Sequence, residues 1–302
     1  MKNKIIAFDL GGSSIKYSTN QLKDFQIEKI ENINKDLVID FISSISNKEQ
    51  ATEICISSPS IIDSEIGKIS GISAIKNWNS ENIFDEIKQK LNNKNTKIYI
   101  ENDGNCSLLG NIEMINKKVN SAISIVVGTG IGGALYIDGK IVKGANNSSG
   151  EIGMVTSLDS QKQASLLFSI FSLIKNVSKV LNREVTGEEV FELFEKKNEK
   201  VYEIIDKWIY GLSIFTFNLI WIIDPEYVVI GGAVSINKTF QKIFLENISK
   251  VYKKVSDDIS ELLKTKKTFE LTAKIVFSEK GNQSNIFCLL YTSPSPRDRS
   301  LS

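Results

Sequence analysis

A strand pattern, a glycine-rich turn and a second strand pattern follow one another at the start of the chain, and the same arrangement recurs near its middle. The first copy reads KIIAFDL, GGSS and IKYSTN, and the second reads SAISIVV, GTGIGG and ALYIDGKIV. Glycine supplies the positive φ that tight hairpin turns require. A repeated hairpin with a glycine-rich tip predicts two α/β halves, and 302 residues are enough for two lobes.

The rest of the chain alternates between helical and strand patterns. Apolar residues recur with helical spacing in the longer segments, and shorter β-branched runs predict buried strands. We expect helices at 35–48, 80–93, 163–181, 187–196 and 200–223. We expect strands at 97–102 and 227–230, and a strand that continues into a loop at 51–60. The Asp224-Pro225 pair ends the last of these helices. The predicted lobes are residues 1–118 and 119–287.

The composition indicates a globular protein with a small-molecule partner. Lys plus Arg number 37 and Asp plus Glu number 36, so no global field is available to attract nucleic acid or an anionic membrane. The three cysteines show no CxxC spacing, which fits a reducing cytoplasm. The apolar stretches SLLFSIFSLI and IYGLSIFTFNLIWII are shorter than the roughly 18 to 20 residues that a membrane helix needs.

The end of the chain differs in composition from the rest. The segment YTSPSPRDRSLS holds two of the four prolines and two of the three arginines of the whole sequence. We interpret residues 288–302 as a non-native tail of the kind produced by sequencing-adapter read-through. A native disordered terminus is the alternative.

The turn GTGIGG contains the pattern GxGxxG at Gly128, Gly130 and Gly133. A dinucleotide fingerprint must open a helix, but a period-two strand pattern follows here. Backbone N–H groups of a glycine turn can still surround a phosphate. Two such turns, with a third glycine pair at Gly231 and Gly232, favour a nucleotide-binding clamp over plain hairpin turns.

Three charged residues are candidates for a functional role, and two of them, Asp9 and Asp103, each allow two interpretations. Asp9 is either an Asx-turn residue or a ligand of a magnesium-bound water. Lys16 on a hairpin strand is expected to be solvated. Asp103 is either the N-cap of the helix that DGNCSLLGN begins or, in a chain without histidine, the base of a phosphoryl transfer.

Four segments together resemble the ROK family of sugar kinases, repressors and open reading frames. They are AFDLGGSSIKY, ENDGNCSLLGN, VVGTGIGGALYIDGKIVKGANNSSGEIG and DPEYVVIGGAVS, and the resemblance covers about residues 4–287. It implies an α/β, actin-like ATPase fold with two lobes and a central cleft. It also implies that ATP and Mg²⁺ bind in that cleft, that the cleft closes on a sugar, and that the protein is a homodimer.

The resemblance implies a role for particular residues. Asp103 matches the catalytic base, and Asn102, Asp103, Glu151 and Ser60 match sugar-binding positions. Asp9 matches the residue that holds Mg²⁺ through water. The residues that match the ATP and phosphate motifs are Asp9, Gly11, Gly12, Ser13, Gly128, Thr129, Gly130, Gly132, Gly133, Gly231 and Gly232.

The chain also departs from the family pattern. Met154 stands where zinc-containing members have a histidine, and no cysteine cluster follows, so we expect no structural zinc. Ser60 stands where many members have a glycine near the sugar, and Asn285 replaces another expected glycine. We expect Trp78 to be a packing residue rather than a platform for sugar stacking.

The function indicated by this resemblance is an ATP-dependent kinase of a hexose, an amino-hexose or a glycoside in the cytoplasm. The alternatives are a sugar-responsive repressor and a sugar-binding member without catalysis. A repressor needs a helix-turn-helix module ahead of the fold, and the first strand pattern begins about four residues into this sequence. The presence of Asp103 favours catalysis.

Overall fold

The computed structural model describes residues 4–20, 24–115, 117–157, 159–265, 269–279 and 283–291. The chain forms two compact units. Unit 1 comprises the described residues of Met1–Lys117, Lys143–Ser149 and Gln283–Ser302, and unit 2 comprises those of Lys118–Val142 and Gly150–Asn282. Each unit has its own sheet and its own hydrophobic core.

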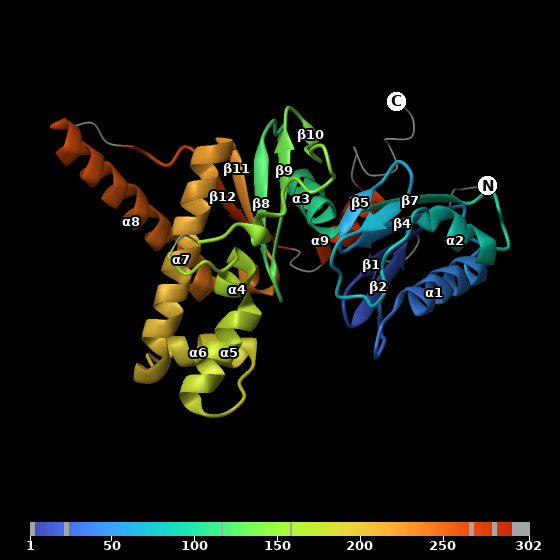
Figure 1. Ribbon diagram of the computed structural model, residues 1–302, viewed down its shortest axis with the longest axis horizontal. Helices are drawn as coiled ribbons and strands as arrows, with labels where there is room; N and C mark the ends of the chain where they lie inside the picture. Colours follow the sequence, from blue (N-terminus) through green and yellow to red (C-terminus); the bar gives the residue numbers. More distant parts are fainter. Residues whose placement is uncertain are drawn as a thin grey trace. The chain divides into compact units, whose positions relative to one another are not determined.

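Unit 1 is built on a five-stranded sheet in the order β3-β2-β1-β4-β7 (Figure 1). Its strands are β1 (Ile5–Leu10), β2 (Ser14–Thr19), β3 (Gln26–Lys29), β4 (Glu53–Ser58) and β7 (Lys97–Asn102). The first three strands are antiparallel neighbours, whereas β1, β4 and β7 run parallel. A separate two-stranded ribbon consists of β5 (Ile61–Asp63) and β6 (Lys68–Ser70).

Helices cover both faces of this sheet. The helices are α1 (Lys35–Lys48), α2 (Ile83–Lys90), α3 (Asp103–Met114) and α9 (Ser284–Tyr291). Alternate residues of a strand point to opposite faces. Ile6, Phe8 and Leu10 of β1 belong to the core that α1 and α2 complete. Asp9 lies on the other face, where α9 reaches it through Asn285.

Unit 2 repeats the strand arrangement of unit 1. Its sheet has the order β10-β9-β8-β11-β12, formed by β8 (Ala122–Val127), β9 (Ile131–Ile137), β10 (Lys140–Ile141), β11 (Tyr227–Gly231) and β12 (Lys274–Phe277). Again three antiparallel strands are followed by two that run parallel to the central one. The predicted duplication of a hairpin with a glycine-rich tip is therefore confirmed, and it extends to the whole sheet.

The helices of unit 2 supply most of the residues of its hydrophobic core. They are α4 (Ala164–Phe168), α5 (Ile170–Leu181), α6 (Gly187–Glu195), α7 (Glu199–Ile223) and α8 (Lys238–Leu263), with short 3-10 helices η1 (Ile152–Met154) and η2 (Ala233–Ile236). Helix α7 ends at Ile223, as predicted from the Asp224-Pro225 pair, and Asp224 follows it in the left-handed conformation. In the described part of the chain, no helix is long and apolar enough to cross a membrane.

One predicted helix starts later in the structure than expected, and another is interrupted in its middle. The helix expected at 80–93 begins only at Ile83, because Asn82 caps it by accepting a hydrogen bond from the backbone N–H of Asp85. The helix expected at 163–181 is broken at Ser169. This residue is extended, and its side chain caps α5 by accepting from the backbone N–H of Ser172.

The units also differ from the predicted division into 1–118 and 119–287. Residues 143–149 belong to unit 1, where Lys143 pairs with Glu101. Residues 283–287 belong to unit 1 as well, because they enter α9. The predicted boundary of the tail falls inside this helix, in which Cys288, Leu289 and Leu290 are buried. The remainder of the predicted tail, 292–302, lies outside the described residues.

Replacing Gly110 by alanine tests the packing of α9 on α3. The added Cβ would lie 2.3 Å from the carbonyl oxygen of Ser284, a backbone atom. We expect Gly110→Ala to lower the free energy of unfolding by about 1–3 kcal/mol, although alanine is intrinsically the better helix former by about 1 kcal/mol.

Urea unfolding measures this change, with Gly187→Ala in α6 as the matched control. The Cβ of that variant would lie 3.6 Å from its nearest neighbour, which is ordinary contact. A Gly110→Ala protein as stable as the wild type would contradict the packing of α9 on α3.

Candidate functional site

Three polar residues lie side by side where the parallel strands of unit 1 end. The register pairs Asp9 of β1 with Ser57 of β4, and Ser57 with Glu101 of β7. All three side chains are buried. Open α/β sheets bind ligands outside the carboxyl ends of their strands, so this row identifies the candidate functional edge of unit 1.

The Asp9 carboxylate accepts hydrogen bonds from three elements. Its Oδ1 accepts from the hydroxyl of Ser57 at 2.9 Å and from Nδ2 of Asn285 at 2.8 Å. Its Oδ2 accepts from Nζ of Lys16 at 3.1 Å. The expectation that Lys16 is simply solvated is wrong, because the antiparallel register places it directly opposite Asp9.

The tip of the first hairpin follows Asp9. The N–H of Gly11 donates to the carbonyl of Ser14 at 2.9 Å, which closes the turn. A Cβ on Gly12 would lie 2.7 Å from the Cβ of Ala74, so glycine permits close approach of that segment. Gly12 and Ser13 are exposed.

The predicted sugar-binding pair lies at the start of α3. Asn102 is the N-cap: its Oδ1 accepts from the N–H of Asn105 at 3.2 Å, and its Nδ2 donates to the carbonyl of Ser60 at 3.0 Å. Asp103 is the first residue of the helix, and its Oδ1 accepts from the N–H of Gly104 at 2.8 Å. The alternative in which Asp103 is the N-cap is therefore wrong, and Asp103 remains partly exposed.

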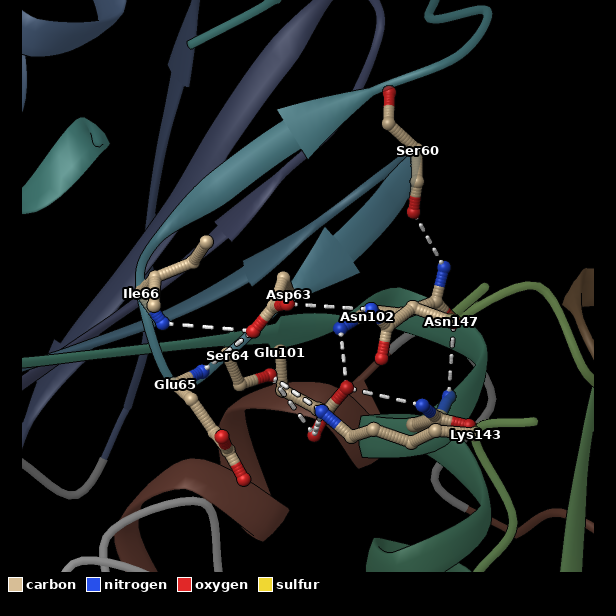
Figure 2. Close-up of polar contacts among 10 residues, drawn as sticks. Ser60, Asp63, Ser64, Glu65, Ile66, Glu101, Asn102, Lys143 and Asn147 are labelled. Atoms are coloured by element: carbon tan, nitrogen blue, oxygen red, sulfur yellow. Dashed lines mark hydrogen bonds and ion pairs between the residues drawn. The ribbon is translucent and has the colours of Figure 1, made fainter. Parts of the chain in front are cut away.

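Glu101, which the sequence analysis missed, is the centre of the polar contacts in Figure 2. Its side chain is 0% exposed. Its Oε1 accepts from the N–H of Asn102 and from Nδ2 of Asn105, both at 2.9 Å. Its Oε2 accepts from the hydroxyl of Ser64 at 3.3 Å and lies 3.1 Å from Nζ of Lys143. No local pattern indicates this role, because two of the partners come from distant segments.

Ser60 is held in an unusual backbone conformation between β4 and β5. Its φ of 98° lies in the region that favours glycine, which gives a physical reason for the glycine expected there. Strained residues of this kind cluster at functional sites. Nearby, Trp78 is 1% exposed and donates from Nε1 to the hydroxyl of Ser58 at 2.7 Å. The prediction that Trp78 packs in the core is confirmed.

The second glycine-rich turn joins β8 to β9 in unit 2. The N–H of Gly128 donates to the carbonyl of Gly130 at 2.9 Å. The hydroxyl of Ser165 accepts from the N–H of Ile131 at 3.0 Å, and the carbonyl of Gly128 accepts from the N–H of Ile170 at 3.0 Å. Thr129 is exposed at the tip. A strand follows this turn, which confirms that it is not a dinucleotide fingerprint.

The glycines after this tip serve different purposes. A Cβ on Gly132 would meet only ordinary contact, 3.7 Å from Val126, whereas one on Gly133 would lie 2.6 Å from a side-chain atom of Ile152. Gly133 therefore permits β9 to pack against η1. Gly231 ends β11, and Gly232 has a φ of 86°. A Cβ on Gly232 would lie 2.1 Å from the carbonyl oxygen of Val127, so only glycine fits there.

Glu151 precedes η1 in unit 2. The residue is exposed, but partial shielding of its carboxyl group from water raises its pKa above the ordinary value. Met154, at the predicted histidine position, is 60% exposed. Among the described residues, no group of three or more His, Cys, Asp or Glu side chains could hold a metal ion. The expectation of no structural zinc stays a prediction.

The predicted site residues divide between the two units. Unit 1 brings together the hairpin tip 11–13, Asp9, Ser60, Asn102 and Asp103 at the ends of its strands. Unit 2 carries the turn 128–133, Glu151 and the pair 231–232. Each unit thus contains one glycine-rich hairpin tip, and the polar row of Asp9, Ser57 and Glu101 occurs in unit 1.

Comparison with known sequences identifies one family. The sequence model of the ROK family matches residues 5–268 of this chain. A β-glucoside kinase of Listeria innocua serovar 6a is 24% identical over 256 residues, which span 78% of this chain and 85% of that protein.

Solved structures share the fold. A ROK family protein from Streptococcus pneumoniae TIGR4, in complex with sucrose, superposes with a TM-score of 0.81 at 22% identity, covering 95% of this chain and 96% of that one. A ROK family glucokinase from Streptomyces griseus, in complex with glucose and AMPPNP, superposes with a TM-score of 0.73 at 16% identity. The match covers 94% of this chain and 97% of that one. The predicted α/β, actin-like ATPase fold is confirmed.

Proposed function

Because the chain belongs to the ROK family, we propose that it is a sugar kinase, which transfers the γ-phosphate of ATP to a hydroxyl of a hexose, an amino-hexose or a glycoside. The observation that carries the proposal is the placement of Asp103. It is partly exposed just after the carboxyl end of β7 and immediately follows Asn102. The side-chain amide of Asn102 is fixed by two hydrogen bonds, because its Nδ2 donates to Ser60 and its Oδ1 accepts from Asn105. A carboxylate in this place can accept the proton of a sugar hydroxyl.

On the sugar side, Asn102 and Asp103 bind the hydroxyls and Asp103 acts as the base. Phosphoryl transfer needs mainly positioning and charge neutralisation, and protein kinases also use an aspartate to accept the proton. The hydrogen bond from the N–H of Gly104 fixes one carboxylate oxygen of Asp103. Ser60 supports this arrangement because its carbonyl accepts from Asn102. Glu151, which matches a sugar-binding position of the family, is a further residue that we propose for sugar binding.

On the nucleotide side, the backbone N–H groups of the two hairpin tips bind the phosphates. In unit 1 these are Gly11, Gly12 and Ser13, and in unit 2 they are the residues of the turn 128–133. Successive N–H groups in a glycine turn form an anion-binding nest. The pair Gly231 and Gly232, where a side chain would not fit, lies beside the adenosine.

The surroundings of Asp9 fit a magnesium ion held through water. Mg²⁺ prefers oxygen ligands, keeps several waters and takes one or two carboxylates beside phosphates. Asp9 supplies a carboxylate near the end of β1, next to the hydroxyl of Ser57 and two residues before the tip 11–13, in which Gly12 and Ser13 are exposed. Bound there with ATP, the ion would neutralise charge on the phosphates. Lys16 orients the Asp9 carboxylate from the neighbouring strand.

The named relatives favour a neutral sugar or glycoside as the substrate. The similar proteins include a β-glucoside kinase, a sucrose-bound protein and a glucokinase bound to glucose. We propose a cytoplasmic location, where ATP is available. The three cysteines, all among the described residues, are buried and form no disulfide with one another, which is consistent with a reducing compartment.

Replacing Asp103 by asparagine removes the proposed base and keeps the size of the side chain. We expect kcat to fall by about 10²- to 10⁴-fold, the usual loss when a general base is removed. The measurement is ADP release from Mg-ATP with the sugar that gives the highest wild-type rate. Asp40→Asn is the matched control, because Asp40 forms an exposed ion pair with Lys90 on the surface of unit 1.

Turnover of Asp103→Asn within a few fold of the wild type would exclude this base. A folded wild-type protein that binds sugar in a calorimeter but releases no ADP would instead favour the alternative, a sugar-binding member without catalysis.

Replacing Asp9 by asparagine should weaken the response to magnesium. Because Asp9 acts through water, we expect the half-saturating Mg²⁺ concentration to rise about 10- to 100-fold, as is typical for a partner outside the direct ligands. Sugar binding measured without nucleotide should stay unchanged, which is the internal control. An unchanged magnesium requirement would contradict the role of Asp9.

A further inference from the structure

We infer that Lys143 is a positioning residue for the sugar: its ion pair with Glu101 ties the segment 143–149, here called the strap, to the strand end that carries Asn102 and Asp103. The inference rests on the proposed function, because it concerns the sugar site of a kinase. It adds two residues, Lys143 and Glu101, that the sequence motifs did not assign.

The strap is a short closed loop that belongs to unit 1. The residues before it, up to Val142, and after it, from Gly150, belong to unit 2. The N–H of Ser149 donates to the carbonyl of Lys143 at 3.0 Å, so the first and last residues of the strap are joined. The strap contacts the rest of unit 1 through Lys143 and, at 3.5 Å, through Asn147 with Asp63 (Figure 2).

The ion pair is the stronger of these contacts because Glu101 is fully buried. A buried carboxylate needs an opposite charge and hydrogen-bond donors to remain ionised inside a protein. Lys143 supplies the charge at 3.1 Å, and its Nζ also donates to the hydroxyl of Ser64 at 2.7 Å. Ser64 in turn donates to the same carboxylate oxygen. Loss of Lys143 would remove this positive charge from the side of the buried carboxylate.

The same carboxylate also holds the start of α3. Its other oxygen accepts from the N–H of Asn102 and from the side chain of Asn105. Asn102 caps the helix, and Asp103 follows it. A shift of Glu101 towards water would therefore move both residues proposed to bind the sugar. Lys143 itself contacts Glu101 and Ser64 and acts on the sugar only through them, so it is not a catalytic residue.

The test compares Lys143→Met, Lys143→Arg, Glu101→Gln and the double variant Lys143→Met/Glu101→Gln with the wild type. In Lys143→Met we expect the KM for the sugar to rise about 10- to 100-fold, the size of effect that a small misplacement of binding groups produces, and the KM for ATP to change less than about twofold. Lys143→Arg, which keeps the charge, should restore much of the sugar affinity.

The double variant keeps the inference testable if Lys143→Met folds poorly. Removing both charges of a buried pair destabilises the folded protein less than removing one partner and leaving the other charge buried. Since the tie is already broken in Lys143→Met, the double variant should raise the KM for the sugar no further than that single change does. An effect equal to the product of the two single changes would show that the residues act independently, and would overturn the inference.

A second readout does not depend on activity. Hydrogen exchange of the strap amides, without any ligand, should be faster in Lys143→Met than in the wild type and close to the wild type in Lys143→Arg. The matched control is Lys68→Met, which breaks an exposed ion pair with Glu81 of 2.8 Å in the same unit. This control should change neither the KM for the sugar nor the exchange of the strap.

The outcomes separate this inference from the proposed function. An active wild type combined with an unchanged KM for the sugar, or unchanged strap exchange, in Lys143→Met overturns the inference alone. Equal increases in both KM values would mean a general loss of structure and would also overturn it. A wild type without sugar-dependent ADP release contradicts the proposed function, and the inference fails with it.

Discussion

Two carboxylates buried in one row impose the main constraint on unit 1. Asp9 and Glu101 stand on parallel strands with Ser57 between them, all on the same face of the sheet. Burying a charge is unfavourable unless donors and an opposite charge surround it. Lys16 meets this need for Asp9 from the neighbouring strand, and Lys143 meets it for Glu101 from the strap. The proposed sugar and magnesium residues lie directly beside these two pairs.

The duplicated architecture explains how one chain can present two glycine-rich hairpin tips, for which we propose phosphate binding. Both sheets have three antiparallel strands followed by two parallel ones, and in both the first hairpin ends in glycines. The two units then differ in the polar groups that they add. Unit 1 adds the buried carboxylates, whereas the turn of unit 2 is braced by Ser165 and by the start of α5. The proposed base Asp103 and the proposed magnesium residue Asp9 both lie in the unit with the buried carboxylates.

The elements that the sequence predicted well are those set by local patterns. The hairpins follow from period-two strands and glycine turns, and α1 follows from its helical spacing. The break at Ser169 was missed because the apolar pattern continues through it, while a side-chain cap starts a new helix. Contacts between segments that are distant in the sequence could not be predicted from local patterns. Asn285 reaches Asp9 across 276 residues of sequence, and Lys143 reaches Glu101 from the strap, which lies between β10 and η1 in the sequence.

The account depends most on sugar-dependent phosphoryl transfer. The most direct measurement is ADP release from Mg-ATP by the full chain with glucose, N-acetylmannosamine, N-acetylglucosamine, fructose or cellobiose, together with the mass of the product. The account predicts that at least one of these sugars accelerates ADP release and yields one sugar phosphate for each ADP. A folded protein that releases ADP at the same rate with and without every sugar would contradict it.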